Sequence, residues 1–345
     1  MKTASALPLV MLALSSASLS AATLTPVMIG LDNPRGLAFG PEGALYVVEA
    51  GRGGTDSCAM LRGLLRCQGP SGALSRLWKG TQERVAFGFP SYSDAGANET
   101  TGAHDVAFLG RGHATVSIGF GGAPVLREDF GPAGAGFGTL IQVAASGQWQ
   151  YVADVSAYEA LANPAGGPVD TNPYGLLAEP GATVVADAGA NALLRVAANG
   201  EVSTIAAFRS RPADSTDAVT TSVARGPDGA YYVGELTGAP FVAGAARVYR
   251  VVPGANPEIF LEGFKTIIDL DFGPDGSLYV LQYATGPVFF PGPGQVIRVL
   301  PNGSRSVVVE GLSFPTSVLA APDGSLYISN RGTSVLTGEV LHAVF

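Results

Sequence analysis

The sequence predicts an all-β protein, a six-bladed β-propeller with four-stranded blades, whose last blade is closed by the N-terminal strand. The first observation is a short phrase that recurs six times: an apolar strand, a Pro-Asp-Gly-type reversal, and a second strand rich in Tyr and Val. This pattern indicates a hairpin, because Gly and Asp tolerate the positive φ of a tight turn. Aligned on a turn glycine, the copies read FGPEGALYVVEA (Gly43), FLGRGHATVSIG (Gly112), LAEPGATVVADA (Gly181), RGPDGAYYVGEL (Gly229), FGPDGSLYVLQY (Gly276) and AAPDGSLYISNR (Gly324).

The second observation is the spacing of these glycines, which are 69, 69, 48, 47 and 48 residues apart. A period in the forties with several strands per unit is typical of propellers. The third is composition: 47 Gly and 24 Pro in a chain that is 47% hydrophobic suit many tight turns rather than disorder.

The remaining strands of each repeat follow the hairpin in order. A third strand is expected at residues 72–78, 138–144, 192–198, 246–252, 295–301 and 339–345. In five repeats a second turn and a fourth strand come next, but the sixth repeat ends at Phe345 after its third strand. We therefore expect Thr23–Leu31 to pair beside the last strand, which closes the ring and removes an exposed sheet edge.

The N-terminal residues have the pattern of a segment that is removed by processing. Lys2 is the only charge before an apolar run that includes Leu7–Leu14, and Ser20-Ala21-Ala22 offers small residues for cleavage. We predict a signal peptide at residues 1–22, one propeller domain at 23–345, and a secreted or periplasmic protein. The apolar run is too short to span a membrane, and no span is expected in the mature chain.

The charge and the cysteine content limit which classes of binding partner and which cellular compartment are expected. The formal net charge is −8, and no Lys/Arg cluster with interleaved aromatic residues occurs, so no nucleic-acid partner is expected. We expect a monomer.

The only cysteines, Cys58 and Cys67, lie in a long loop after the second strand of the first repeat. In an exported chain this spacing favours a disulfide that pins the loop.

Several segments resemble the ScyD/ScyE family of exported bacterial propeller proteins. They are GELTGAPFVAGAARVYRVVPG (234–254), IIDLDFGPDGSLYVL (267–281), DTNPYGLL (170–177), VADAGANALLRV (185–196) and NPRGLAFGPEG (33–43). The cysteine loop fits the same pattern, so the resemblance covers the mature chain. It implies a propeller of uncharacterised activity and transfers no catalytic residue. NHL-type and lactonase-type propellers are more distantly similar.

In a propeller, ligands bind mostly on the face that carries the loops around the inner strands. Each second strand should end on this face, six residues after its turn glycine. The residues at these six strand ends are Glu49, Ile118, Asp187, Glu235, Gln282 and Asn330. The strand entries, seven or eight residues before the glycine, are Arg35, His104 with Asp105, Tyr174, Thr221, Asp269 and Thr316. Together these positions predict a polar ring at the mouth of the channel.

Two interpretations of this ring stay open. In one, Glu49, Asp187, Glu235 and Asn330 bind a divalent cation such as Ca²⁺, and His104 is the candidate general base. Arg35, His104, Tyr174 and Asp269 would then bind the ligand. In the other, the strand-end side chains cap their own loops. No GxSxG or HExxH motif supports a serine hydrolase or a zincin.

The extra sequence in the first two repeats is expected on the same face. Phe120, Phe130 and Phe137 stand among glycines there, which suggests either a mobile apolar flap over the channel or a plain surface excursion. Two functions follow: a protein that binds a small metabolite or a protein partner on the loop face, or an envelope enzyme such as a metal-assisted, lactonase-like hydrolase or an aromatic-metabolite processing enzyme.

Overall fold

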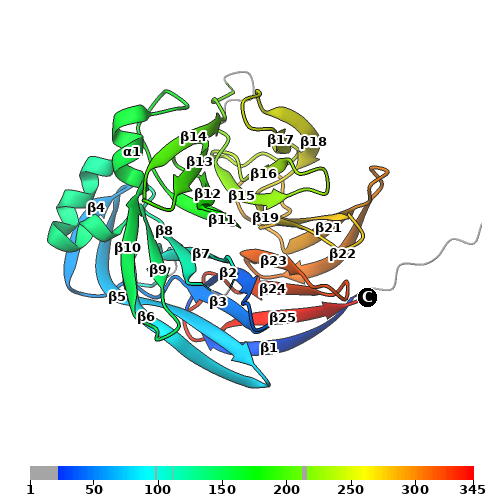
Figure 1. Ribbon diagram of the computed structural model, residues 1–345, viewed down its shortest axis with the longest axis horizontal. Coiled ribbons are helices and arrows are strands. Elements are labelled where there is room, and N and C mark those ends of the chain that lie inside the picture. The colour runs from blue at the N-terminus through cyan, green and yellow to red at the C-terminus, as the bar shows by residue number, and fades with distance from the viewer. Residues whose placement is uncertain (1–21, 98, 111, 212–215) are drawn as a thin grey trace, which may run out of the picture.

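The computed structural model describes residues 22–345 except 98, 111 and 212–215. The described chain forms six antiparallel sheets arranged as a ring (Figure 1). The predicted six-bladed propeller is therefore confirmed. The predicted signal peptide falls on residues 1–22, of which 1–21 lie outside the described part. Within the described part, no helix combines the length and apolarity needed to cross a bilayer.

Blades 1 to 5 take their four main strands in chain order from the centre outward. Blade 1 has β2 Pro34–Phe39, β3 Leu45–Glu49, β5 Leu64–Trp78 and β6 Thr81–Ser93, with β4 Ser57–Leu61 added to β5. Blade 2 has β7 Ala103–Phe108, β8 Ala114–Ile118, β9 Thr139–Val143 and β10 Trp149–Asp154; blade 3 has β11 Pro173–Glu179, β12 Ala182–Asp187, β13 Ala192–Ala197 and β14 Val202–Ala207. Blade 4 has β15 Thr220–Arg225, β16 Tyr231–Glu235, β17 Ala246–Val251 and β18 Glu258–Phe264; blade 5 has β19 Ile267–Phe272, β20 Leu278–Gln282, β21 Gly294–Val299 and β22 Arg305–Leu312.

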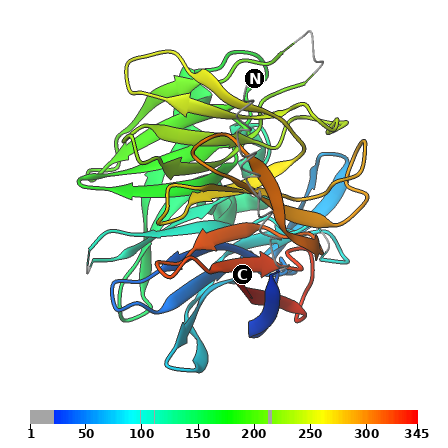
Figure 2. The same cartoon turned by 90° about the vertical axis from the view of Figure 1, so that its right-hand side faces the viewer.

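The sixth blade closes the ring as predicted. It contains β23 Ser317–Ala320, β24 Leu326–Asn330 and β25 Gly338–Val344, and its outer strand is β1 Thr23–Leu31. β1 pairs antiparallel with β25, with Met28 opposite Val340. Figures 1 and 2 show the blue β1 beside the red β25 from two directions. Met28 and Leu31 are buried in the core that joins blade 6 to blade 1, so this strand contributes packing as well as pairing.

The turn glycines show why the repeat is recognisable in the sequence. In five blades the aligned glycine has a positive φ, as at Gly43 (82°) and Gly324 (87°), a conformation that costs other residues energy. Blade 2 differs, because its positive φ falls on Gly110 (60°) rather than on Gly112. Gly112 still holds the same place in its turn as Gly43, because the N–H of each donates to the carbonyl three residues earlier, that of Leu109 and that of Gly40.

The predicted disulfide is confirmed, and the segment that carries it is more ordered than a loop. Cys58 and Cys67 form an S–S bond and lie opposite each other in the β4–β5 hairpin. The hairpin packs against the 3-10 helical segment η1, Pro124–Gly136, of blade 2. The disulfide therefore fixes a hairpin that contacts the neighbouring blade.

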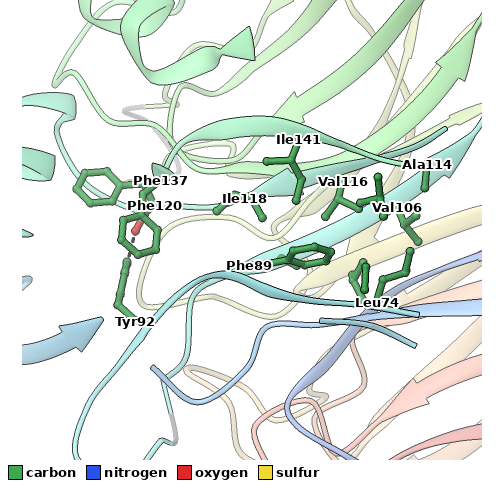
Figure 3. Close-up of a cluster of buried hydrophobic side chains, with 14 of the residues drawn as sticks. Leu74, Phe89, Tyr92, Val106, Ala114, Val116, Ile118, Phe120, Phe137 and Ile141 are labelled. Carbon is green, nitrogen blue, oxygen red and sulfur yellow. Dashed lines mark hydrogen bonds between the residues drawn. The ribbon is translucent and has the colours of Figure 1, made fainter. Parts of the chain in front are cut away.

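The hypothesis of a mobile apolar flap is wrong. Phe120, Phe130 and Phe137 are at most 1% exposed and pack around Tyr92 (Figure 3, which labels Phe120, Phe137 and Tyr92). The Tyr92 ring stacks on Phe130 at 5.4 Å between centroids, and its hydroxyl donates to the Phe120 carbonyl. Because these aromatic side chains are core residues, the excursion is a fixed part of blades 1 and 2.

Candidate functional site

The six positions predicted at the ends of second strands lie there in the structure. Glu49, Ile118, Asp187, Glu235, Gln282 and Asn330 are the last residues of β3, β8, β12, β16, β20 and β24. Their shared place in the repeat puts them all on the loop face. What each side chain does there depends on its own surroundings.

Glu49 is fully buried and occupied by partners from its own blade. Its Oε1 accepts from Ser75 Oγ at 2.6 Å and from Arg84 Nε at 2.9 Å. Its Oε2 accepts from Arg84 Nη2 at 2.6 Å and from the Asp32 backbone N–H at 2.7 Å. The carboxylate is thus neutralised and fully hydrogen-bonded without any ion.

The other three proposed cation ligands are also bound by nearby loops. Asp187 Oδ1 accepts from the backbone N–H groups of Asn172, Gly189 and Ala190, and its Oδ2 accepts from Thr171 Oγ1. Glu235 pairs with Arg211, and Asn330 bonds Ser313 N and Glu339 Oε1. Among the described residues, no three His, Cys, Asp or Glu side chains form a group that could hold a metal ion. The structure therefore shows these side chains as loop caps and does not bring the four together.

Irregular strand pairing aims the first-strand side chains into the mouth of the channel. In blades 2, 3 and 4 the register skips one residue, at His104, Tyr174 and Thr221, and β-bulges of this kind re-aim side chains. In blade 5 the skipped residue is Ile268, so Asp269 is one position further along the strand. Asp269 does not line the mouth cavity, and the choice of Asp269 as a mouth residue is wrong by one position.

The mouth of the channel holds a cavity of about 310 Å³. Three of the four predicted ligand-binding residues, Arg35, His104 and Tyr174, line it together with Thr316. The other lining residues are Leu61, Arg62, Arg66, Tyr92, Glu99, Thr100, Thr101, Asn172, Leu236, Ile268, Tyr283, Phe290 and Thr333. The size suits a small molecule, and polar groups stand at fixed places among aromatic rings.

Arg35 is the most unusual group in this cavity. Arg35 is only 7% exposed. Its guanidinium donates hydrogen bonds to the backbone carbonyls of Pro34, Thr100 and Gly332. No described carboxylate forms an ion pair with it. These bonds use three of the five N–H groups of a guanidinium. Buried charges in proteins are ordinarily paired, so an anion would complete the surroundings of Arg35.

His104 lies beside Arg35 and is held as a neutral imidazole. Its Nδ1 is 3.1 Å from the Pro173 carbonyl, so Nδ1 carries the proton and donates to that oxygen. Its ring centroid is 4.5 Å from that of Tyr174. Burial and the charge of Arg35 lower the pKa of His104 to about 3. An imidazole with so low a pKa is a poor general base near neutral pH, which argues against the catalytic role considered for it.

The hairpin and loops of blade 1 add residues that the repeat could not predict. Arg66 is buried and pairs with Glu99, while Arg62 at the hairpin tip pairs with Asp170. On the far side Tyr283 contacts Phe290, with 5.2 Å between ring centroids. For Arg62 and Arg66 the sequence does offer a signal, because three arginines, at positions 52, 62 and 66, lie in a segment expected on the ligand face of an acidic chain.

Below the mouth, a second cavity of about 410 Å³ is lined by the first strands of all six blades. Asp105, Asp269 and Asp271 line it, and their carboxylates accept backbone N–H groups of Leu176, Val318 and Ala320 in the next blades. Burial raises the pKa of Asp269 to about 7 and that of Asp271 to about 6. Through these hydrogen bonds to backbone N–H groups, the carboxylates join neighbouring blades.

Comparison with solved structures gives the fold of this chain. A gluconolactonase from Xanthomonas campestris has a TM-score of 0.57 at 12% identity, with 96% of this chain and 93% of that chain covered. A calcium-binding regucalcin from Agrobacterium tumefaciens has a TM-score of 0.56 at 14% identity, with 94% and 93% covered. A catalytically inactive virginiamycin B lyase from Staphylococcus aureus, solved with quinupristin, has a TM-score of 0.52 at 11% identity, with 94% and 99% covered. No family model matches the chain, and no curated protein is significantly similar to it in sequence. At these identities the likeness shows the six-bladed propeller fold alone.

Proposed function

We propose that this protein binds a small anionic metabolite with a planar or aromatic part in the mouth of its channel. The observation that carries the proposal is Arg35, a guanidinium almost removed from solvent, with two N–H groups left over and no carboxylate partner among the described residues. A carboxylate or other oxyanion accepts such a fork of donors in a bidentate way.

The rest of the cavity supports the same ligand class. Tyr174 and His104 form one aromatic edge, and Tyr283 with Phe290 forms another. Flat faces of this kind favour planar ligands. Arg62 and Arg66 add positive charge at the rim, although each already has a carboxylate partner. The wall is therefore both aromatic and cationic in a chain whose net charge is −8.

The family and the compartment belong to the same proposal. We place the protein with the exported ScyD/ScyE-type propellers, on the sequence segments that resemble them and on the Cys58–Cys67 disulfide, a bond typical of exported proteins. The alternative of a lactonase-like hydrolase rests on likeness of fold. It loses support because Glu49, Asp187 and Glu235, its oxygen ligands, are already hydrogen-bonded within their own loops.

The test compares acids with their neutral counterparts. The mature protein is titrated calorimetrically with benzoate and indole-3-carboxylate, and in parallel with benzamide and indole-3-carboxamide. We expect saturable binding of the acids and at least tenfold weaker binding of the amides, because only the acids satisfy Arg35. Equal binding of acid and amide contradicts the anionic class, and the absence of binding for every compound contradicts the ligand class as a whole.

Variants locate the site. Arg35→Gln should weaken acid binding at least tenfold, whereas Arg195→Gln, which removes the same charge from an exposed position on β13, should leave binding unchanged. Because Arg35 also bonds carbonyls of blades 1 and 6, thermal unfolding of each variant is measured first. The comparison of acid with amide in the unsubstituted protein needs no variant and decides the ligand class in any case.

A further inference from the structure

Glu159 is a buried carboxylate without a side-chain partner among the described residues. It lies in α1, Val155–Ala162, the short helix that follows the last strand of blade 2, and it is 1% exposed. No side chain of the described residues hydrogen-bonds Oε1 or Oε2, and the one donor that faces the carboxylate is the backbone N–H of Asp170. A carboxylate in this position loses its hydration and is only weakly compensated, unless something else binds it.

The same corner of the molecule holds other unsatisfied oxygens. Ser156 Oγ and Asp170 Oδ1 are buried and also lack partners. Eight side-chain atoms of this kind occur in the described chain, and four of them belong to Ser156, Glu159 and Asp170. All four are oxygens, the atoms that hard cations prefer. Their concentration in one short segment, between residues 156 and 170, is what needs an explanation.

Packing brings these residues together. Ser156 and Glu159 are three residues apart on α1 and therefore face the same side. A Cβ placed on Gly138 would lie 2.6 Å from Ser156 Cβ and 3.5 Å from Thr171 Cγ2, so the start of the helix is packed close to the residue after Asp170. A Cβ on Gly189 would lie 2.7 Å from Asp170 Oδ1, which places Asp170 against the loop after β12.

The charge balance of this corner is negative. Burial and the nearby carboxylates of Asp187 and Asp170 raise the pKa of Glu159 to about 7. Asp170 Oδ2 pairs with Arg62 at 3.1 Å, but Arg62 is 61% exposed and leaves Oδ1 free. Asp187 is satisfied by hydrogen bonds alone. A cation is the ligand that would relieve both the missing hydrogen bonds and the excess negative charge.

We propose that Glu159, Asp170 and Ser156 form a binding site for a hard divalent cation, with Ca²⁺ as the preferred ion. Ca²⁺ accepts carboxylate and neutral oxygen ligands in irregular arrangements, whereas Mg²⁺ demands a near-ideal octahedron. Asp170 and residues 165–168 also line a cavity of about 420 Å³ on the loop face, which gives an ion a route from solvent. The site shares none of its three proposed ligands with the four strand-end residues first considered for a cation, although Asp187 lies nearby. It also shares no ligand with the mouth cavity, which it meets at the Arg62–Asp170 ion pair.

The experiment uses the full mature chain, stripped with EDTA and titrated calorimetrically with Ca²⁺ and, separately, with Mg²⁺. We expect one saturable Ca²⁺ site, tighter than the Mg²⁺ site by at least tenfold, and a melting temperature that rises with Ca²⁺ concentration, because an ion that binds only the folded state stabilises it. Glu159→Gln should weaken Ca²⁺ binding at least tenfold. Glu201→Gln, an equal loss of charge at an exposed position, should not change it.

The stability of the ion-free variant separates this proposal from a purely structural role. Glu159→Gln removes the unsatisfied charge at nearly constant volume, so without Ca²⁺ it should melt at or above the temperature of the unsubstituted protein, while losing the Ca²⁺ response. If Glu159→Gln fails to fold, Ser156→Ala and Asp170→Asn provide the same comparison. The absence of a saturable Ca²⁺ site, or binding that all three substitutions leave intact, overturns the proposal and leaves a buried protonated carboxyl or a bound water as the explanation.

Discussion

The carboxylate of Asp269 in β19 accepts a hydrogen bond from the backbone N–H of Val318 in β23, with 2.9 Å between Oδ2 and N. Ser317 Oγ donates to the same oxygen at 2.7 Å. The first strands of neighbouring blades belong to different sheets, so their inner backbone groups have no strand partner. Asp269 supplies one, as Asp105 does for Leu176. Side chains in the channel thus join the blades of this propeller.

This arrangement predicts how stability depends on pH. Burial raises the pKa of Asp269 to about 7, against about 3.9 in an unfolded chain. Between these values the folded protein binds more protons than the unfolded one, so the free energy of unfolding falls as pH rises and levels off above about pH 8. His104, with its pKa lowered to about 3, acts in the opposite direction, but only below about pH 6.5.

The measurement is urea unfolding at pH 6, 7 and 8. Asp269 alone should account for a loss on the order of 1 kcal/mol between pH 6 and pH 8, and Glu159 and Asp271, whose pKa values are also raised, add to it. The total loss should therefore be smaller in Asp269→Asn and unchanged in Asp56→Asn, whose side chain is exposed. A profile that is equally steep in Asp269→Asn would show that another group titrates.

The closure of the ring predicts unequal effects for two neighbouring residues of β1. Met28 is 1% exposed and packs with Leu37 and Val340, whereas Ile29 is 65% exposed. Met28→Ala should lower the free energy of unfolding by about 2–5 kcal/mol, because it leaves a cavity where blades 6 and 1 meet. Ile29→Ala should change it by no more than about 0.5 kcal/mol. Chemical denaturation compares the two, and equal losses would mean that β1 is not part of the folded core.

The blades could be predicted from the sequence because the information in each one is local. A turn glycine and two alternating strands specify a hairpin, and the repeat multiplies the signal six times. Side-chain partners could not be predicted in this way. Glu49 is neutralised by Arg84 from β6, a partner that the repeat does not specify. The bulged residue of blade 5 is Ile268, eight residues before Gly276 as His104 is before Gly112, so Asp269 at seven residues is not the mouth residue. The sequence does not predict the burial of Phe130 either, because that burial depends on its contact with Tyr92 of the neighbouring blade.

The disulfide predicts a modest and local contribution to stability. Cys58 and Cys67 are nine residues apart, and the chain-entropy model assigns about 2–3 kcal/mol to so short a loop. The double substitution Cys58→Ala/Cys67→Ala should lower the free energy of unfolding by that amount, and dithiothreitol should lower that of the unsubstituted protein equally. Hydrogen exchange should rise mainly in β4 and the first half of β5. A global loss of protection would instead make this hairpin part of the main folding unit.

A substitution of Glu49 distinguishes a loop-capping role from a cation-binding role. Its oxygens accept four hydrogen bonds, two of them from Arg84, whose side chain is 41% exposed. Glu49→Gln replaces one acceptor oxygen with a donor and leaves Arg84 with Asp32 as its remaining acidic partner. Breaking a fully buried pair costs about 3–5 kcal/mol, and because Arg84 reaches solvent we expect about 1–3 kcal/mol. Denaturation in EDTA and in Ca²⁺ measures both consequences. A cap predicts the same loss in both solutions, whereas a loss that appears only with Ca²⁺ would return Glu49 to the list of metal ligands.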